Sequence, residues 1–237
     1  PTAYWDGAKT RRSAAVAKTL QANLMAKCAY EACSSNSLCS EEPYIISRSG
    51  ATGIWRYAQV WSGDNRTSWS ALRNGVSMLL GGGLCGLVNY GHDCEGFAGG
   101  RPSRELFVRW IQHGCFQARF SIHSCNDDNS VTLPWMYDTP EESSTGIVQD
   151  VNCGPSKTKE VITPSAAIAA AIRLRYELMP FWYSLHVEAS IYGTPILRPY
   201  CFCFQDIDHS ERMWNESETY MLGSSLLVAN VLKPNSE

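Results

Sequence analysis

The sequence predicts an α/β fold with a parallel sheet, closed as part of a (β/α)8 TIM barrel. Short apolar runs alternate four times with segments of helical periodicity between residues 44 and 200 of the 237-residue chain, a pattern typical of parallel strands joined by helical crossovers. No G-x-G-x-x-G or P-loop follows a strand, which disfavours a doubly wound nucleotide-binding sheet. Arg48, Asp93 and His123 stand at or just beyond the C-terminal ends of expected strands, where barrels keep their chemistry. Four units make half of a barrel, because a whole one takes about 250 residues.

The first third of the chain predicts a helix, a strand and a second helix. Apolar residues recur every four positions over 13–33, as on one face of a helix. A polar stretch then precedes the short β-branched run 43–48, interpreted as a buried strand, and a glycine-containing loop follows as far as residue 65. Ser68 is expected to cap the second helix, and the three glycines at 81–83 are expected to end it.

The middle of the chain repeats this alternation. An apolar strand is expected over 84–90, followed by a helix over 103–114 that Ser103 caps and by a strand over 118–122 that ends at His123. Residues 138–162 are polar and rich in Ser, Thr and Pro, so they are interpreted as an inserted loop, which at that length is either functional or mobile.

The last third predicts one long helix, a fourth strand and a change of architecture. Thr163 and Pro164 form a helix start, Pro180 should kink the helix, and Gly193 should end it before the strand 195–198. The apolar run 220–231 follows an acidic loop with no helix between. We therefore expect two domains: residues 1–205 as half of a barrel, and residues 206–237 as a linker and the first strand of a β-sandwich domain.

Composition excludes several classes of protein. Twenty Lys and Arg against 23 Asp and Glu give a formal net charge of −3 without a basic block, so no nucleic-acid partner is expected. No apolar run approaches 18 residues, so no membrane partner is expected. The ten cysteines contain no paired C-x-x-C motifs, which argues against structural zinc and favours free, buried thiols, while the compartment stays open.

Three polar segments are expected to converge on one pocket. They carry Trp61 and Asp64, Asp93, and His123. Carboxylates beside tryptophans suit sugars, because the sugar ring stacks on the aromatic face while carboxylates bind hydroxyls or donate protons. Simpler interpretations stand beside this one: Asp64 could belong to a turn before a helix, His123 could be a core histidine, and the tryptophans could be core residues.

Several motifs, in order along the chain, resemble those of glycoside hydrolase family 31. The resemblance covers roughly residues 20–232. Its segments are R-S at 48–49, R-Y at 56–57, W-S-G-D-N at 61–65, G-H-D-C-E-G-F at 91–97, E-L-F-V-R-W at 105–110, F-S-I-H-S at 120–124, L-R-Y-E-L-M-P at 174–180, P-I-L-R-P at 195–199 and L-G-S-S-L-L-V-A at 222–229.

This resemblance implies a retaining α-glycosidase acting on terminal α-linked glucose-type residues. It assigns Asp64 as the general acid/base, a role that calls for apolar neighbours and a second carboxylate to keep the acid protonated. It further implies that the subsite for the non-reducing sugar is lined by Arg48, Trp61, Asp93, Phe97 and His123. It implies no metal and no cofactor, and a carbohydrate as the ligand.

The resemblance also indicates what this chain lacks. The aspartate that serves the family as nucleophile lies upstream of the helix over 13–33, and Asp6 does not match its motif. The chain is therefore expected to be the C-terminal half of the barrel, inactive by itself and completed by an N-terminal half in the same or another chain. Two alternatives stay open: an inactive glycosidase-derived fragment with a structural or sugar-binding role, and an α-glucan lyase. Cys94 and Glu95 depart from the small residues usual at these positions and are expected to alter the shape of the subsite.

Overall fold

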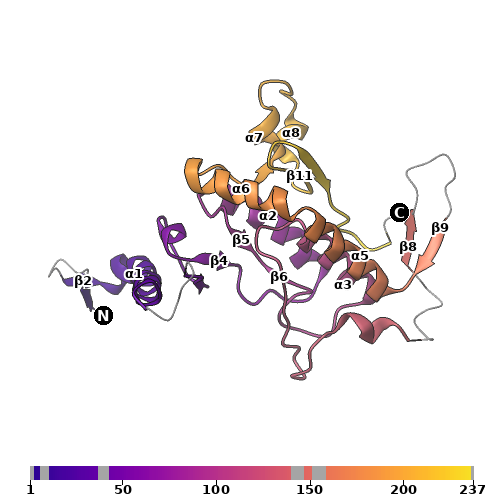
Figure 1. Ribbon diagram of the computed structural model, residues 1–237, viewed down its shortest axis with the longest axis horizontal. Helices are drawn as coiled ribbons and strands as arrows, with labels where there is room; N and C mark the ends of the chain where they lie inside the picture. The colour runs from indigo at the N-terminus through magenta and orange to yellow at the C-terminus, as the bar shows by residue number, and fades with distance from the viewer. Residues whose placement is uncertain (1–2, 6–10, 37–42, 140–146, 151–158, 236–237) are drawn as a thin grey trace.

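The computed structural model describes residues 3–5, 11–36, 43–139, 147–150 and 159–235. Figure 1 shows an elongated arrangement, with helix α1 (Ala14–Ser34) and the antiparallel strands β1 (Ala3–Trp5) and β2 (Arg11–Ser13) at one end, and the remaining helices gathered over short strands. The helix expected over 13–33 is confirmed as α1.

Parallel strands form the part of the fold that carries the polar segments. Strands β3, β4 and β5 form one parallel sheet, and β6 and β7 form a parallel pair. Their bounds are β3 (Ile46–Ser47), β4 (Gln59–Trp61), β5 (Tyr90–Gly91), β6 (Asp93–Cys94) and β7 (Ser121–Ile122). The parallel pairing predicted for this region is thus confirmed, although β4 lies within the stretch expected to be a loop.

Strand β3 is more exposed than predicted. The run 43–48 was expected to be buried, but Ile46 is 43% exposed and Tyr44 is also exposed. β3 lies at the edge of its sheet, and the preceding helix α1 packs on β1 and β2 instead of covering it. The prediction of burial is therefore wrong.

Helix α2 (Trp69–Leu84) begins as predicted but ends later. The Ser68 hydroxyl accepts a hydrogen bond from the backbone N–H of Ala71 at 3.1 Å, which confirms the cap. The glycines at 81–83 lie inside the helix, where they permit close packing: a Cβ on Gly82 would lie 3.1 Å from the Tyr90 ring. Gly86, with φ 88°, takes the left-handed conformation after the helix. The predicted helix end is wrong, and the strand expected over 84–90 shrinks to β5.

Helices α3 and α5 complete a continuous core with α2. They are α3 (Arg104–Gly114), capped by Ser103, and α5 (Pro164–Glu177), capped by Thr163. Both caps were predicted. The largest buried side chains are Trp110, Trp182, Tyr220, Phe107, Ile54, Leu72, Ile111 and Ile168. Because one core joins the parallel strands, these helices and the C-terminal sheet, packing fixes all three relative to one another.

The expected long helix is divided in two. α5 stops at Glu177 and α6 (Met179–Tyr192) starts after Leu178, with Pro180 in its first turn, where its missing N–H costs no helical hydrogen bond. Gly193, with φ 69°, ends α6 as predicted.

The C-terminal sheet corrects the assignment of the fourth strand. β10 (Leu197–Pro199) pairs antiparallel with β11 (Thr219–Leu222), which pairs antiparallel with β12 (Leu226–Ala229). The strand expected over 195–198 therefore does not join the parallel strands, because its backbone partners lie in the segment that follows it. This sheet crosses the division placed between residues 205 and 206, and that division stays a prediction.

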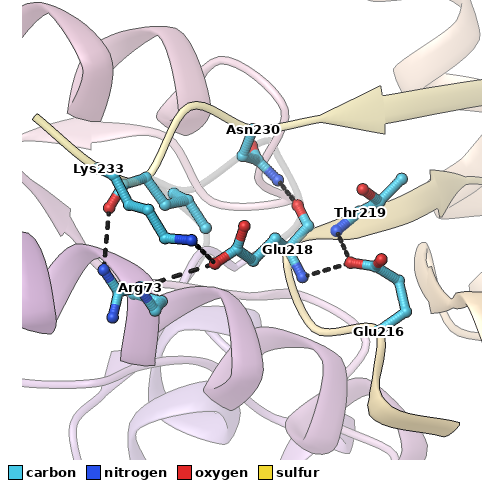
Figure 2. A network of polar contacts seen from close by, with 7 residues as sticks. Arg73, Glu216, Glu218, Thr219, Asn230 and Lys233 are labelled. Carbon is cyan, nitrogen blue, oxygen red and sulfur yellow. Dashed lines mark hydrogen bonds and ion pairs between the residues drawn. The ribbon is translucent and has the colours of Figure 1, made fainter. Parts of the chain in front are cut away.

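Polar contacts fasten the C-terminal sheet to α2 (Figure 2). The Arg73 guanidinium lies 3.8 Å from the Glu218 carboxylate and donates to the Leu232 carbonyl at 3.5 Å, and Lys233 approaches the same carboxylate at 3.9 Å. The Asn230 amide donates to the Glu218 carbonyl at 2.6 Å. The ion pairs are part-exposed and add little individually, so the apolar core carries the attachment.

The remaining predictions on local structure have mixed outcomes. The insertion 138–162 contains the antiparallel strands β8 (Ile147–Asp150) and β9 (Lys159–Ile162) in its described part. The eight cysteines in the described part of the chain are free, as predicted, but only Cys94 and Cys115 among them are buried. Cys201 and Cys203 lie on helix α7 (Tyr200–Phe204) instead of a strand, and helix α8 (Glu211–Asn215) follows. Among the described helices, none is long and apolar enough to cross a bilayer.

Arg175 on α5 holds the chain segment that leads into β7. Its guanidinium donates to the carbonyls of Cys115, Gln117 and Ala118 at 2.8, 2.9 and 3.3 Å, and it stacks 4.4 Å over the Trp182 ring. A lysine cannot reproduce this planar fork.

We expect Arg175→Lys to lower the free energy of unfolding by about 2 kcal/mol, because carbonyl oxygens lose charged donors. Thermal and urea unfolding of the complete protein would measure the loss. Arg173→Lys, an exposed position on the same helix, is the matched control and should unfold like the parent. Equal effects of the two substitutions would contradict this role for Arg175.

Candidate active site

Arg119 joins the ends of the parallel strands. Its guanidinium donates to an Asp93 carboxylate oxygen at 3.0 Å and lies 5.7 Å from the centre of the Trp61 ring. Its backbone N–H reaches the Tyr90 carbonyl at 3.5 Å. One side chain and its backbone therefore connect the ends of β4, β5 and β6, two of which carry the predicted site residues Trp61 and Asp93.

The Asp93 carboxylate is buried and balanced by this arginine. The side chain of Asp93 is 1% exposed. Burial raises the pKa of Asp93, while the hydrogen bond and charge of Arg119 oppose that rise. Asp64 raises the pKa of Asp93 further and His123 lowers it, so these two side chains are close enough to act on one carboxyl. The structure thus brings together Asp64, Asp93 and His123, which together span 59 positions of the chain.

Asp64 lies on a tight turn in front of α2 and faces Arg48. Its carboxylate lies 3.1 Å from the Arg48 guanidinium, and its side chain is 44% exposed. Gly63 makes this approach possible: it has φ 79°, and a Cβ there would lie 2.5 Å from Arg48 Nε. The apolar enclosure expected for an acid at this position is not provided by the described residues, because the carboxylate borders solvent and a guanidinium.

The aromatic side of the site is formed by Phe97 and His123. Their ring centres lie 4.9 Å apart, and His123 is exposed. The loop carrying Phe97 is held to the following segment by the hydrogen bond from the Cys125 N–H to the Phe97 carbonyl at 2.8 Å. An exposed imidazole beside a phenyl ring can donate or accept a hydrogen bond over an apolar wall, which suits one face of a sugar.

The structure shows the local surroundings on which the simpler interpretations of these residues depend. The turn before α2 is real, since the Asn65 N–H bonds the Gly63 carbonyl at 3.0 Å, yet it directs Asp64 towards Arg48. His123 is not a core histidine, because it is exposed. Trp61 is only partly buried, with one face toward Arg119.

A buried polar chain lies behind Asp93. The Gln117 side-chain oxygen accepts a hydrogen bond from the backbone N–H of His92 at 3.0 Å. The Gln117 side-chain nitrogen lies 2.7 Å from His92 Nε2 in the imidazole ring. The rings of His92 and His113 stack with centres 5.3 Å apart, and His113 Nδ1 lies 2.9 Å from the Asn230 side chain. Burial lowers the pKa of His92 and lowers that of His113 to about 4. Both rings are therefore neutral at pH 7 and link the site to the C-terminal sheet without a net charge.

Sequence reasoning missed Arg119 and Gln117. Their signal was present in the run that leads into β7, where a glutamine and an arginine interrupt apolar residues just before the expected strand. A buried polar side chain needs a partner, and the nearest unpaired carboxylate on a neighbouring strand end was Asp93.

The chain belongs to glycoside hydrolase family 31. Residues 4–185 match the model described as the Glycosyl hydrolases family 31 TIM-barrel domain, and residues 193–237 match the Glycosyl hydrolase family 31 C-terminal domain. The resemblance inferred from the ordered motifs is thereby confirmed at the level of the family.

Curated relatives are named as α-glucosidases. The chain is 32% identical over 191 residues to a rice protein named probable glucan 1,3-alpha-glucosidase, covering 81% of this chain and 18% of the relative. It is 33% identical over 196 residues to human neutral alpha-glucosidase C, covering 83% of this chain and 18% of the relative. The chain therefore spans about a fifth of the length of these relatives.

Solved structures agree with this placement. The crystal structure of a glucosidase II alpha subunit in its Tris-bound form superposes with a TM-score of 0.74 at 26% identity, covering 92% of this chain and 21% of that one. A cycloalternan-degrading enzyme from Trueperella pyogenes superposes with a TM-score of 0.75 at 24% identity, covering 95% of this chain and 29% of the other, which shows the fold alone.

The Asp93–Arg119 pair gives a testable consequence. Asp93→Asn leaves the Arg119 guanidinium buried without a counter-charge, so we expect a loss of about 3–5 kcal/mol in the free energy of unfolding. Asp93→Asn combined with Arg119→Met should recover part of that loss, because no uncompensated charge remains. Urea unfolding in a double-mutant cycle would measure it, and simple additivity of the two substitutions would contradict the pairing.

Proposed function

We propose that residues 1–237 form the C-terminal half of the catalytic barrel of a retaining α-glycosidase and the start of its C-terminal β-domain. The substrates would be oligosaccharides or glycosides with terminal α-linked glucose-type residues. Membership of family 31 and the names of the curated relatives support this reaction class. The observation that carries the proposal is the cluster in which Asp64 and His123 both act on Asp93, bordered by Trp61 and Phe97.

The geometry supports different roles for the carboxylates of Asp64 and Asp93. Asp64 lies on the exposed side of the cluster, where it can reach a glycosidic oxygen, and Arg48 holds its orientation. Asp93 is buried and engaged by Arg119 on one oxygen, while its second oxygen makes no hydrogen bond to the described residues. We therefore assign Asp64 as general acid/base and Asp93 as an acceptor for a sugar hydroxyl, a contact that requires the groups covering its second oxygen to move aside when the sugar binds.

The remaining residues of the proposed subsite supply shape and donors. Arg48 and His123 can donate hydrogen bonds to hydroxyl groups. Trp61 and Phe97 can cover apolar faces of the ring. Such a subsite would fix one sugar against Asp64, and positioning of this kind accounts for much of the rate of an enzyme.

The nucleophile is proposed to come from a segment outside residues 1–237. A retaining mechanism needs two carboxyl groups about 5–5.5 Å apart, one of which attacks the anomeric carbon. Asp93 is unsuited to attack, because it is buried and paired. The apolar side chains exposed on α5 and α6, which include Tyr176, Tyr183 and Ile191, would be covered by that missing half of the barrel, in the same or another chain.

The second candidate function is a catalytically inactive, sugar-binding or structural role. Only one solvent-accessible carboxylate, Asp64, lies among the proposed site residues, which favours a sugar-binding or structural role if residues 1–237 act without a second half. An α-glucan lyase would use the same residues and differ in its product.

We expect residues 1–237 expressed alone to be insoluble or inactive on aryl α-glucosides. The open edge at β3 and the exposed apolar faces promote aggregation, and the proposed nucleophile is absent. Expression trials and release of nitrophenol would test this. Turnover by residues 1–237 that disappears in Asp64→Asn would overturn the proposal that the nucleophile lies elsewhere.

Asp64→Asn in the complete protein tests the acid/base assignment. The substitution removes proton donation but keeps the shape, so turnover should fall by about 10²–10⁴-fold. The loss should be smallest for nitrophenyl glycosides, whose leaving group hardly needs a proton. Azide should partly restore turnover, because it attacks the glycosyl-enzyme without a base. Equal losses for good and poor leaving groups, with no effect of azide, would contradict the assignment.

Asp93→Asn is the companion variant and should behave differently. A carboxylate that accepts a hydroxyl transfers no proton, so binding and turnover should weaken for every leaving group, without azide rescue. Because this variant is also expected to be less stable, the kinetics should be measured well below its unfolding midpoint. Rescue of Asp93→Asn by azide would indicate that Asp93, and not Asp64, is the acid/base.

A further inference from the structure

Glu95 combines three features that do not occur together at an ordinary structural position. Its side chain is completely buried, with 0% exposure. Neither carboxyl oxygen makes a hydrogen bond to the described residues. Its backbone has φ 84°, a left-handed conformation that non-glycine residues rarely adopt. Strained backbone and unsatisfied buried groups are retained where function requires them.

This burial does not depend on the rest of the protein. The carboxyl oxygens are already inaccessible in the described chain, and further domains can only add cover. No substrate atom can reach Glu95 without rearrangement, so the residue is not a catalytic residue. Its influence must pass through the groups that it touches.

Glu95 lies between the elements that form the proposed subsite. It directly follows β6, two residues after Asp93 and two before Phe97. Across the strand ends, the Ser124 hydroxyl acts on the pKa of Glu95, and Ser124 directly follows His123. Ser124 Oγ already accepts a hydrogen bond from the Thr132 N–H at 3.2 Å, which leaves the O–H of Ser124 to be directed at the carboxyl.

We propose that Glu95 is a positioning residue whose buried carboxyl ties the loop that carries Asp93 and Phe97 to the segment that carries His123. The inference rests on the proposed function for its kinetic consequence. Glycine would suit the backbone conformation at this position better, so glutamate is expected to be there for its side chain.

The charge state of Glu95 follows from its surroundings. Burial raises the pKa of Glu95 to about 7, and the Ser124 hydroxyl opposes that rise. The other ionisable groups nearby are Asp93 and Cys94 on the adjoining strand β6, His123 beyond β7, and Arg66 and Asp127 on the segments that contact residues 96–99. Asp93 is paired with Arg119, and none of these groups contributes to the shift of Glu95.

Ionisation of Glu95 should loosen the tie. Burial disfavours the carboxylate more than the Ser124 hydroxyl stabilises it, so ionised Glu95 must attract water or move, which displaces the loop or the His123 segment. Sugar binding should then weaken as the pH rises through about 7. The unfolded chain loses this proton near pH 4.5 and the folded chain keeps it to about pH 7, so the stability that this group contributes declines between these values as the pH rises.

The test compares Glu95→Gln, Glu95→Ala and Ser124→Ala in the complete protein. Glu95→Gln keeps the size and hydrogen-bonding capacity without ionising, so its KM should stay flat from pH 6 to 8.5 while the KM of the parent rises. Glu95→Ala and Ser124→Ala should lower kcat/KM by about 10- to 100-fold, mainly through KM, because the sugar is misplaced. Glu105→Gln, the same chemical change on α3 away from the site, should match the parent.

A second readout does not require activity. The unfolding midpoint of the parent relative to Glu95→Gln should fall as the pH is raised from 5 to 8, and a crystal structure of Glu95→Ala should show His123 and Phe97 displaced from one another. If the complete protein has no α-glucosidase activity but the unfolding midpoints and the Glu95→Ala structure come out as expected, the proposed function is refuted and Glu95 remains a positioning residue. A pH profile of Glu95→Gln identical to that of the parent, or unchanged His123 and Phe97 in Glu95→Ala, would overturn the inference.

Discussion

The buried ion pair between Asp93 and Arg119 is the interaction on which the site depends. It connects β6 with the segment leading into β7, and the same guanidinium covers the Trp61 ring at the end of β4. A charge at this depth is tolerated only with a partner, because each ion has lost its water. The pair therefore fixes the relative positions of three strand ends whose side chains form the proposed sugar subsite. Arg175 supports it from behind by binding the carbonyls just before Arg119.

Around this pair the fold separates buried from accessible polar groups. Asp93, His92 and Glu95 are enclosed. Burial raises the pKa of the two carboxyl groups and lowers that of His92, so it favours the neutral form of each side chain. Asp64 and His123 stay in contact with solvent. A glycosidase needs both kinds of group, since hydroxyl acceptors must be rigid while the acid/base must exchange protons with water during each cycle. The arrangement thus fits the reaction class proposed from the family.

Much of the architecture could be predicted because its signals are local. Ser68, Ser103 and Thr163 were recognised as helix caps, and the parallel pairing followed from the alternation of strand and helix. The predictions failed where contacts between segments distant in the sequence determine where a helix ends or which strands pair. The glycines at 81–83 continue α2, where Tyr90 packs closely against Gly82 and the Leu197 carbonyl of β10 against Gly83. The strand at 195–198 joins β11 because its partner lies further along the chain.

The sequence by itself determined the family, the order of the motifs and the candidate residues, because these depend on residue identity and on spacing along the chain. Only the tertiary structure decided their partners. Arg119 as the counter-ion of Asp93, Arg48 as the neighbour of Asp64, and the enclosure of Glu95 beside Ser124 all join strand ends that are separate in the sequence. Burial and charge pairing are properties of that three-dimensional neighbourhood, and they are the basis on which we propose a hydroxyl acceptor, a proton donor and an internal tie among these carboxyl groups.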